Sequence, residues 1–178
     1  MNETHVALIS IKSFSNDGIS LLKKVTQDLS QRMDFNRLSS VYKIEGETRS
    51  PQHVHDLKKV SSFDGLSVVA MVETTADAKS LIEDLVAVQA RHESLGEHRS
   101  VSLNLLSYDD RTIMMADLTL PYPEFHLKPE LLFPAVEIWP EYIHPVLNET
   151  LKNLTKRFAN LRWGEFHSQG KSLLDFSC

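Results

Sequence analysis

The order of the short apolar segments is the feature that most constrains how this chain can fold. Residues 5–11, 38–44, 66–72 and 101–106 are short runs rich in apolar and β-branched residues, which is typical of strands. In residues 19–29 and 81–88, apolar side chains recur every three or four positions, which predicts one face of a helix. The predicted order is therefore strand, helix, strand, strand, helix, strand.

This order is that of the split βαβ, or ferredoxin-like, sandwich, in which two helices cover one face of an antiparallel sheet. We therefore expect an α+β fold. Ser15 or Asn16 would cap the first helix, and Thr74 or Thr75 would cap the second. A fold of this kind hosts many unrelated functions, so the activity has to be argued from the site residues.

The rest of the chain predicts an extension of one domain rather than a second core. Residues 112–115 would add a short strand, the prolines between residues 121 and 134 predict an irregular segment, residues 147–158 predict a helix, and a small hairpin is expected around Gly170. We expect a ferredoxin-like domain over residues 1–142, with a C-terminal helix and tail (143–178) packed on it.

Charge and composition exclude several classes of protein. Lys and Arg number 19 against 24 Asp and Glu, a formal net charge of −5, and no basic cluster exceeds a pair, which argues against nucleic acid as a partner. No apolar run approaches the roughly 18 residues of a membrane span. The single cysteine, Cys178, and an N-terminus without signal-peptide features predict a cytoplasmic protein.

Five segments carry a resemblance to a known family, the hydroxymethyldihydropterin pyrophosphokinases (HPPK) of folate biosynthesis. They are Ser39-Ser40-Val41-Tyr42, Val72-Glu73-Thr74, residues 99–106, Leu118-Thr119-Leu120-Pro121 and residues 134–140 with Glu137-Ile138-Trp139-Pro140. The resemblance covers residues 5–142. It implies a ferredoxin-like core and transfer of a pyrophosphoryl group from ATP to the hydroxymethyl group of a reduced pterin, with two magnesium ions.

The resemblance also assigns roles, and here the chain departs from the family. Ser102 and Asn104 stand where two aspartates of a strand would hold the metals, side by side on one face because side chains alternate along a strand. Arg99 is retained. The nucleotide-side equivalents are Ser10, Gln89, His98, Tyr122 and Lys128. The pterin-side equivalents are Tyr42, Ile44, Ser67 and Glu130, and Gly65 replaces an aromatic ring.

These replacements predict an HPPK-like protein, related to folate biosynthesis, that has lost or nearly lost magnesium-dependent transfer and acts as a binding or interaction protein. Without the carboxylates we expect no cofactor, neither ATP nor magnesium. The expected partner is a small polar or anionic ligand, such as a nucleotide or a pterin-like molecule, in a cleft between Ser10, Arg99, Ser102, Asn104 and Tyr122. Monomer and homodimer stay open.

Two alternatives remain. The chain could be a divergent but active pyrophosphokinase, or a scaffold that binds a different small polar anion in a remodelled cleft. The cleft residues could equally satisfy one another. Asp109 and Asp110 could be displaced metal ligands, but adjacent residues on an extended chain point to opposite faces, so a turn is the better interpretation. His53 and His55 are interpreted as solvated loop residues.

Overall fold

The computed structural model describes residues 3–44, 65–93 and 100–175, so His53, His55, His98, Arg99 and Cys178 lie outside the described residues. The elements of the first part are β1 (His5–Ser13), α1 (Gly18–Leu29), β2 (Asp34–Leu38), β3 (Val41–Ile44), β4 (Gly65–Thr74), α2 (Ala78–His92) and β5 (Val101–Tyr108). Those that follow are β6 (Ile113–Met114), β7 (Thr119–Leu120), α3 (Pro129–Ile138), β8 (Ile143–His144), β9 (Glu149–Thr150), α4 (Leu151–Leu154) and β10 (Glu165–Ser168). Short 3₁₀ helices span Thr155–Phe158 and Gly170–Leu173.

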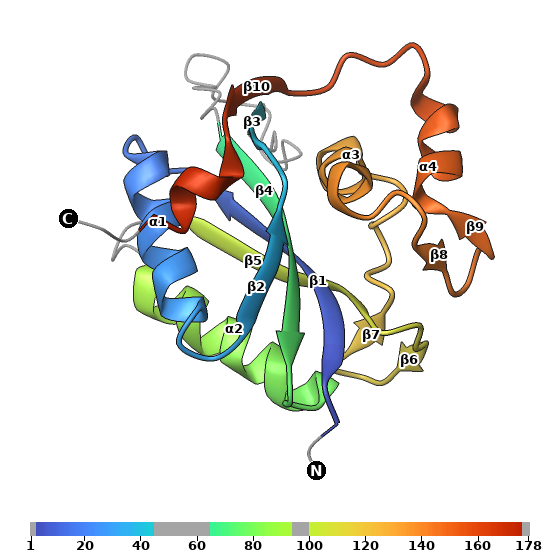
Figure 1. Ribbon diagram of the computed structural model, residues 1–178, viewed down its shortest axis with the longest axis horizontal. Helices are drawn as coiled ribbons and strands as arrows, with labels where there is room; N and C mark the ends of the chain where they lie inside the picture. Colours follow the sequence, from blue (N-terminus) through green and yellow to red (C-terminus); the bar gives the residue numbers. More distant parts are fainter. Residues whose placement is uncertain (1–2, 45–64, 94–99, 176–178) are drawn as a thin grey trace, which may run out of the picture.

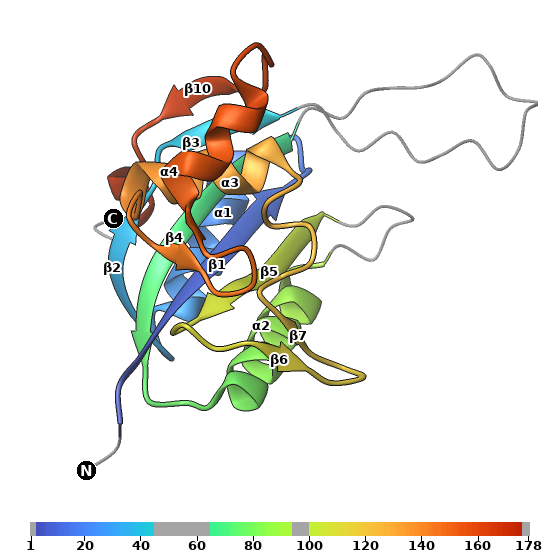
Figure 2. The same ribbon diagram turned by 90° about the vertical axis from the view of Figure 1, so that its right-hand side faces the viewer.

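The main sheet has the order β10-β3-β4-β1-β5, with β2 pairing β4 beside β3, and every pair is antiparallel. Helices α1 and α2 lie on one side of the sheet, and α3 and α4 lie on the other (Figure 1). Figure 2 shows the second side, with α3 and α4 in front of the strands. The predicted ferredoxin-like α+β architecture is therefore confirmed, and a further layer covers the face that the prediction left open.

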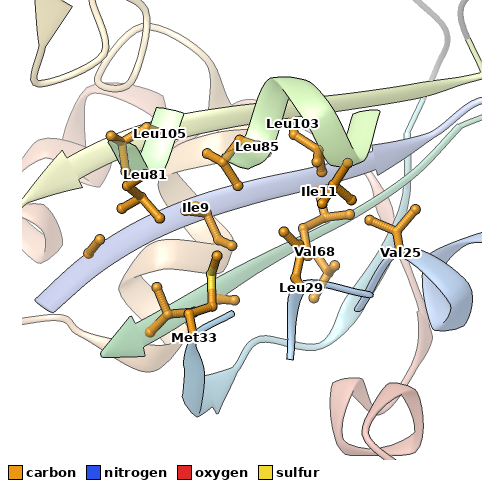
Figure 3. Packing of buried hydrophobic residues seen from close by; sticks show 14 of the residues in the cluster. Ile9, Ile11, Val25, Leu29, Met33, Val68, Leu81, Leu85, Leu103 and Leu105 are labelled. Atoms are coloured by element: carbon orange, nitrogen blue, oxygen red, sulfur yellow. The ribbon is translucent and has the colours of Figure 1, made fainter. Parts of the chain in front are cut away.

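Period-two alternation along β1 separates two hydrophobic clusters. Ile9 and Ile11 are completely buried against α1 and α2, together with Leu81 and Leu85 of α2 (Figure 3). Leu8 points to the opposite face and belongs to a second cluster with residues of α3 and α4. Each apolar row of β1 therefore has its own helical layer, which is why this central strand is buried on both faces.

The predicted second strand is interrupted at Ser39. The backbone N–H of Ser39 donates to Val69 O, and its Oγ accepts from Val69 N, both at 2.9 Å. The side chain thus replaces a carbonyl of the sheet ladder at the break between β2 and β3. Ser39, the first residue of the segment Ser39-Ser40-Val41-Tyr42, therefore has a structural role in the sheet.

Both predicted helix caps are wrong. The N-cap of α1 is Asp17, whose side chain accepts no capping bond, and Ser15 Oγ accepts from Asp17 N instead. The N-cap of α2 is Asp77, whose carboxylate accepts from Ser80 N at 2.8 Å. Thr74 ends β4 and uses its hydroxyl in the preceding turn.

The expected irregular segment contains a helix, α3, although Pro134 lies inside it. Proline at the first helical position needs no N–H partner, which favours the start at Pro129. Inside the helix, Pro134 cannot donate to the carbonyl of Glu130, four residues earlier. Ser67 Oγ donates to that carbonyl at 3.3 Å, so β4 supplies the missing bond.

The C-terminal part also differs from the prediction. The expected helix over 147–158 is reduced to α4 and a 3₁₀ helix, and no hairpin forms at Gly170 among the described residues. Instead β10 joins the edge of the main sheet beside β3. The short strand expected near residues 112–115 is confirmed as β6. The division at residue 142 stays a prediction.

Among the described residues, no helix combines the length and the apolar character that a membrane crossing requires.

A histidine pair joins the segment before α3 to β8. His144 is 3% exposed, and its Nδ1 accepts from Leu147 N at 3.2 Å. The His126 and His144 rings meet edge to face with centroids 5.5 Å apart. His126 Nδ1 and His144 Nε2 are buried and have no partner within the described residues. Burial, and then the neighbouring His126, lower the pKa of His144 to about 4.

We expect Gly170→Ala to destabilise the docking of the C-terminal segment. A Cβ at Gly170 would collide with the carbonyl oxygen of Ser39, which is backbone. The loss should be about 1–3 kcal/mol, or a Tm lower by about 2–10 °C. Gly18→Ala is the matched control, because the nearest atoms to its Cβ would be side-chain atoms of Leu66 and Ser13 rather than backbone. Equal melting temperatures for both variants would contradict the expected collision between a Cβ at Gly170 and the Ser39 carbonyl.

We expect the histidine pair to make stability depend on pH. Because the pKa of His144 is about 4 in the folded state and about 6.5 when unfolded, the unfolded chain binds more protons between these values. The contribution of His144 is therefore complete above pH 6.5 and is lost as the pH falls toward 4. Urea unfolding at pH 7.0, 5.5 and 4.5 should show a smaller loss of stability in His144→Phe than in wild type. The exposed His167→Phe should keep the wild-type slope.

Candidate functional site

A row of mainly polar side chains crosses the sheet on the face that α3 covers. Residues paired across neighbouring strands point to the same face, and the pairs here are Lys12 with Ser67 of β4, Lys12 with Ser102 of β5, and Tyr42 of β3 with Ser67. The row therefore runs Tyr42, Ser67, Lys12, Ser102. We call it the polar row.

A second polar pair lies two residues further along β1. Ser10 pairs with Asn104, and Asn104 Nδ2 donates to Ser10 Oγ and to Ser102 Oγ, both at 3.4 Å. Ser10 is completely buried, whereas Ser102 and Asn104 are half-buried. The structure thus brings together three predicted site residues, and these residues hydrogen-bond one another.

Lys12 is the charged member of the polar row and was not among the predicted site residues. It is 4% exposed, and its Nζ lies 3.5 Å from Glu130 Oε1 at the first turn of α3. The same residue, Glu130, accepts the Ser67 hydroxyl bond at its carbonyl. The predicted pterin-side residues Ser67 and Glu130 therefore meet over Lys12, and a carboxylate faces an ammonium there.

The Tyr42 hydroxyl is held by a hydrogen bond to Glu137 of α3. Tyr42 Oη donates to Glu137 Oε2 at 2.8 Å, and Ser40 donates to Oε1 from both its N–H (2.9 Å) and its hydroxyl (2.7 Å). Burial, and then the hydrogen bond and the charge of Glu137, raise the pKa of Tyr42 to about 12. The Trp163 ring packs on Tyr42. The hydrogen bonds of Glu137 with Ser40 and Tyr42 therefore attach α3 to β3 and to the residue before it.

A cleft of about 840 Å³ opens beside this end of the sheet. It is lined by Ile44, Lys43, Glu130, Arg162, Trp163, Gly164 and Glu165. Ile44 and Glu130 are predicted pterin-side residues, so they do line one cleft. At Gly65, a Cβ would lie 2.8 Å from carbons of the Phe14 ring. Phe14 therefore fills the volume next to the position where the family is expected to carry an aromatic side chain.

The predicted nucleotide-side residues are not all gathered at the polar row. Gln89 supports the edge of the sheet: its Oε1 accepts from Leu103 N at 2.9 Å, and its Nε2 donates to Glu93 at 3.1 Å. Lys128 Nζ lies 3.0 Å from a Glu124 carboxylate oxygen, and Tyr122 Oη donates to Glu124 at 3.3 Å.

The donor set does not fit a pair of magnesium ions. Magnesium prefers carboxylate and phosphate oxygens, whereas Ser102 and Asn104 offer a hydroxyl and an amide, and the Lys12 side chain lies across from Ser102. Within the described ranges, no three His, Cys, Asp or Glu side chains are grouped so that they could hold a metal. Asp109 and Asp110 form the predicted turn, and Asp109 accepts from Val6 N at 2.8 Å.

Comparisons with known proteins agree with this architecture. No protein-family model matches the chain. The chain is 32% identical over 82 residues to a 2-amino-4-hydroxy-6-hydroxymethyldihydropteridine pyrophosphokinase of Synechocystis sp.. The aligned region covers 43% of this chain and 42% of that protein. It is also similar to wild-type HPPK-DHPS of Plasmodium falciparum, solved with SDX-DHP (TM-score 0.68, 14% identity, 89% of this chain and 45% of that chain).

The same protein solved with pteroate gives a TM-score of 0.68 at 13% identity, over 89% of this chain and 43% of that chain. Each of these matches spans less than half the length of the other protein. The antiparallel sheet with its two helical layers defines an α+β sandwich of the ferredoxin-like class. Within that class the chain is similar to HPPK in fold and, over 82 residues, in sequence.

We expect Glu137→Ala to weaken the attachment of α3 to β3. The change removes the acceptor of two Ser40 bonds and of the Tyr42 hydroxyl, which should cost about 1–2 kcal/mol in the free energy of unfolding. Glu149→Ala is the control, because Glu149 makes one exposed ion pair with Arg157. Chemical denaturation measures both variants, and an equal or larger loss at Glu149 would contradict the assigned role of Glu137.

Proposed function

We propose that this HPPK-like protein serves folate biosynthesis as a metal-independent binding protein for a small polar anion, and that it has lost magnesium-dependent pyrophosphoryl transfer. The observation that carries the proposal is the charge of the polar row. Ser102 and Asn104 are neutral where the resemblance puts two metal carboxylates, and Lys12 is a cross-strand neighbour of Ser102.

A cation beside these positions opposes the binding of a second cation. Phosphoryl transfer of the family type depends on divalent ions that neutralise the polyphosphate. A lysine ammonium repels such an ion, and the screening is weak because Lys12 is nearly excluded from water. The same ammonium attracts an anion directly, without a metal between them.

The pterin side supports the same proposal. Phe14 fills the space at Gly65, where the resemblance implies an aromatic ring, and Glu130 presents a carboxylate at a pterin-side position. Ile44 offers no hydrogen bond from its side chain. A pterin ring needs flat apolar surfaces and polar partners at its edge, and these residues do not supply the contacts that the resemblance implies at their positions.

We expect Mg-ATP to bind without a magnesium-dependent gain in affinity, because no carboxylate pair holds the metal against the triphosphate. Isothermal titration with ATP in the presence of magnesium and in the presence of EDTA measures the difference. An active pyrophosphokinase titrated in parallel is the positive control. Transfer to hydroxymethyldihydropterin should stay at background in a coupled assay.

A micromolar affinity that requires magnesium would contradict the proposal and favour the alternative, a divergent active enzyme. Measurable pyrophosphoryl transfer would do the same, even if ATP binding were weak.

A further inference from the structure

The Lys12 ammonium has fewer acceptors than a buried cation requires. Its side chain is 5% exposed, and among the described residues its one acceptor is Glu130 Oε1 at 3.5 Å. A charge-assisted bond of this kind is usually about 2.7–2.9 Å long, and the ammonium carries three donors. Because burying an ion without full pairing costs free energy, this site has capacity for a further anionic group.

Of the two hydroxyls beside Lys12, that of Ser67 donates to Glu130 O, whereas that of Ser102 keeps its donor. Ser67 and Ser102 flank it across the strands. Ser102 Oγ accepts from Asn104 Nδ2, which leaves the Ser102 hydroxyl proton without an acceptor in the described part of the chain.

Glu130 separates Lys12 from the cleft. Its side chain is 24% exposed, against 5% for Lys12, and Glu130 also lines the 840 Å³ cleft with Arg162 and Lys43. The carboxylate can therefore leave Lys12 by turning toward solvent and toward cations that line the same cleft. Its position in the first turn of α3 favours a negative charge in either orientation.

We propose that the polar row around Lys12 binds the phosphate group of a small metabolite, and that the Glu130 carboxylate occupies this place when no ligand is bound. Lys12 supplies the charge, and the hydroxyl of Ser102 supplies a further donor to a phosphate oxygen. Glu130 acts as an internal competitor that swings into the cleft on binding. This inference rests on the proposed function, since it names the anion and the residue that binds it.

The test is a titration of the full chain with inorganic phosphate in EDTA, at constant ionic strength, followed by amide chemical shifts and by calorimetry. Removing the competing charge in Glu130→Gln should tighten phosphate binding by about tenfold or more, the scale of one charge-assisted bond. Lys12→Met should weaken binding by at least about tenfold. Lys152→Met removes an exposed lysine of α4 and should leave the affinity unchanged.

Several results would overturn the inference. Equal phosphate affinity in wild type and Glu130→Gln would show that Glu130 does not compete with phosphate. Circular dichroism shows whether Lys12→Met is folded, and if it is not, the comparison of wild type with Glu130→Gln is the deciding test. Phosphate binding that is unchanged in folded Lys12→Met would place the anion elsewhere and leave the proposed function standing. Magnesium-dependent ATP binding or transfer would instead overturn the proposed function itself.

Discussion

Strand β1 pairs with β4 on one side and with β5 on the other, and this central position determines what each of its side chains can contact. Ile9 and Ile11 are forced into the layer of α1 and α2, whereas Leu8, Ser10 and Lys12 are forced toward α3. Because the period of a strand is two, a slip of one residue would bury the polar set in the main core. The core and the polar row are therefore fixed by one register.

The fold was largely predictable because its main elements carry strong periodicity. Three of the four predicted strands and both helices of the first part are where the apolar patterns put them, whereas the predicted strand 38–44 is divided into β2 and β3. The failures have local causes. Asp77 caps α2 because it immediately precedes the first helical residue, three positions after the predicted Thr74. The helix at Pro134 survives because Ser67 replaces the lost donor, and β10, with exposed side chains such as Phe166, owes its pairing to β3 rather than to its own pattern.

The candidate site was predictable only in part. Alternation along β5 correctly put Ser102 and Asn104 on one face, and the structure adds Ser10 to them. Lys12 was missed because the predicted strand ended at Ile11, although continuing the alternation by one step would have put it beside Ser10. Gln89 could not be assigned from sequence, since its bond to Leu103 N joins a helix to the outer edge of the sheet and depends on tertiary placement.

The charge on the polar row determines which ligands this face of the sheet can attract. Carboxylates at positions 102 and 104 would make this face attract metal cations, and phosphates could then bind only through those metals. With Ser102, Asn104 and a buried Lys12, the charge that the strands place here is positive, and it attracts an anion directly. A buried ammonium without a ligand needs a counter-ion, and Glu130 meets that need because α3 begins above the row. The start of α3 and the charge that β1 places on this face are therefore linked through the ion pair between Glu130 and Lys12.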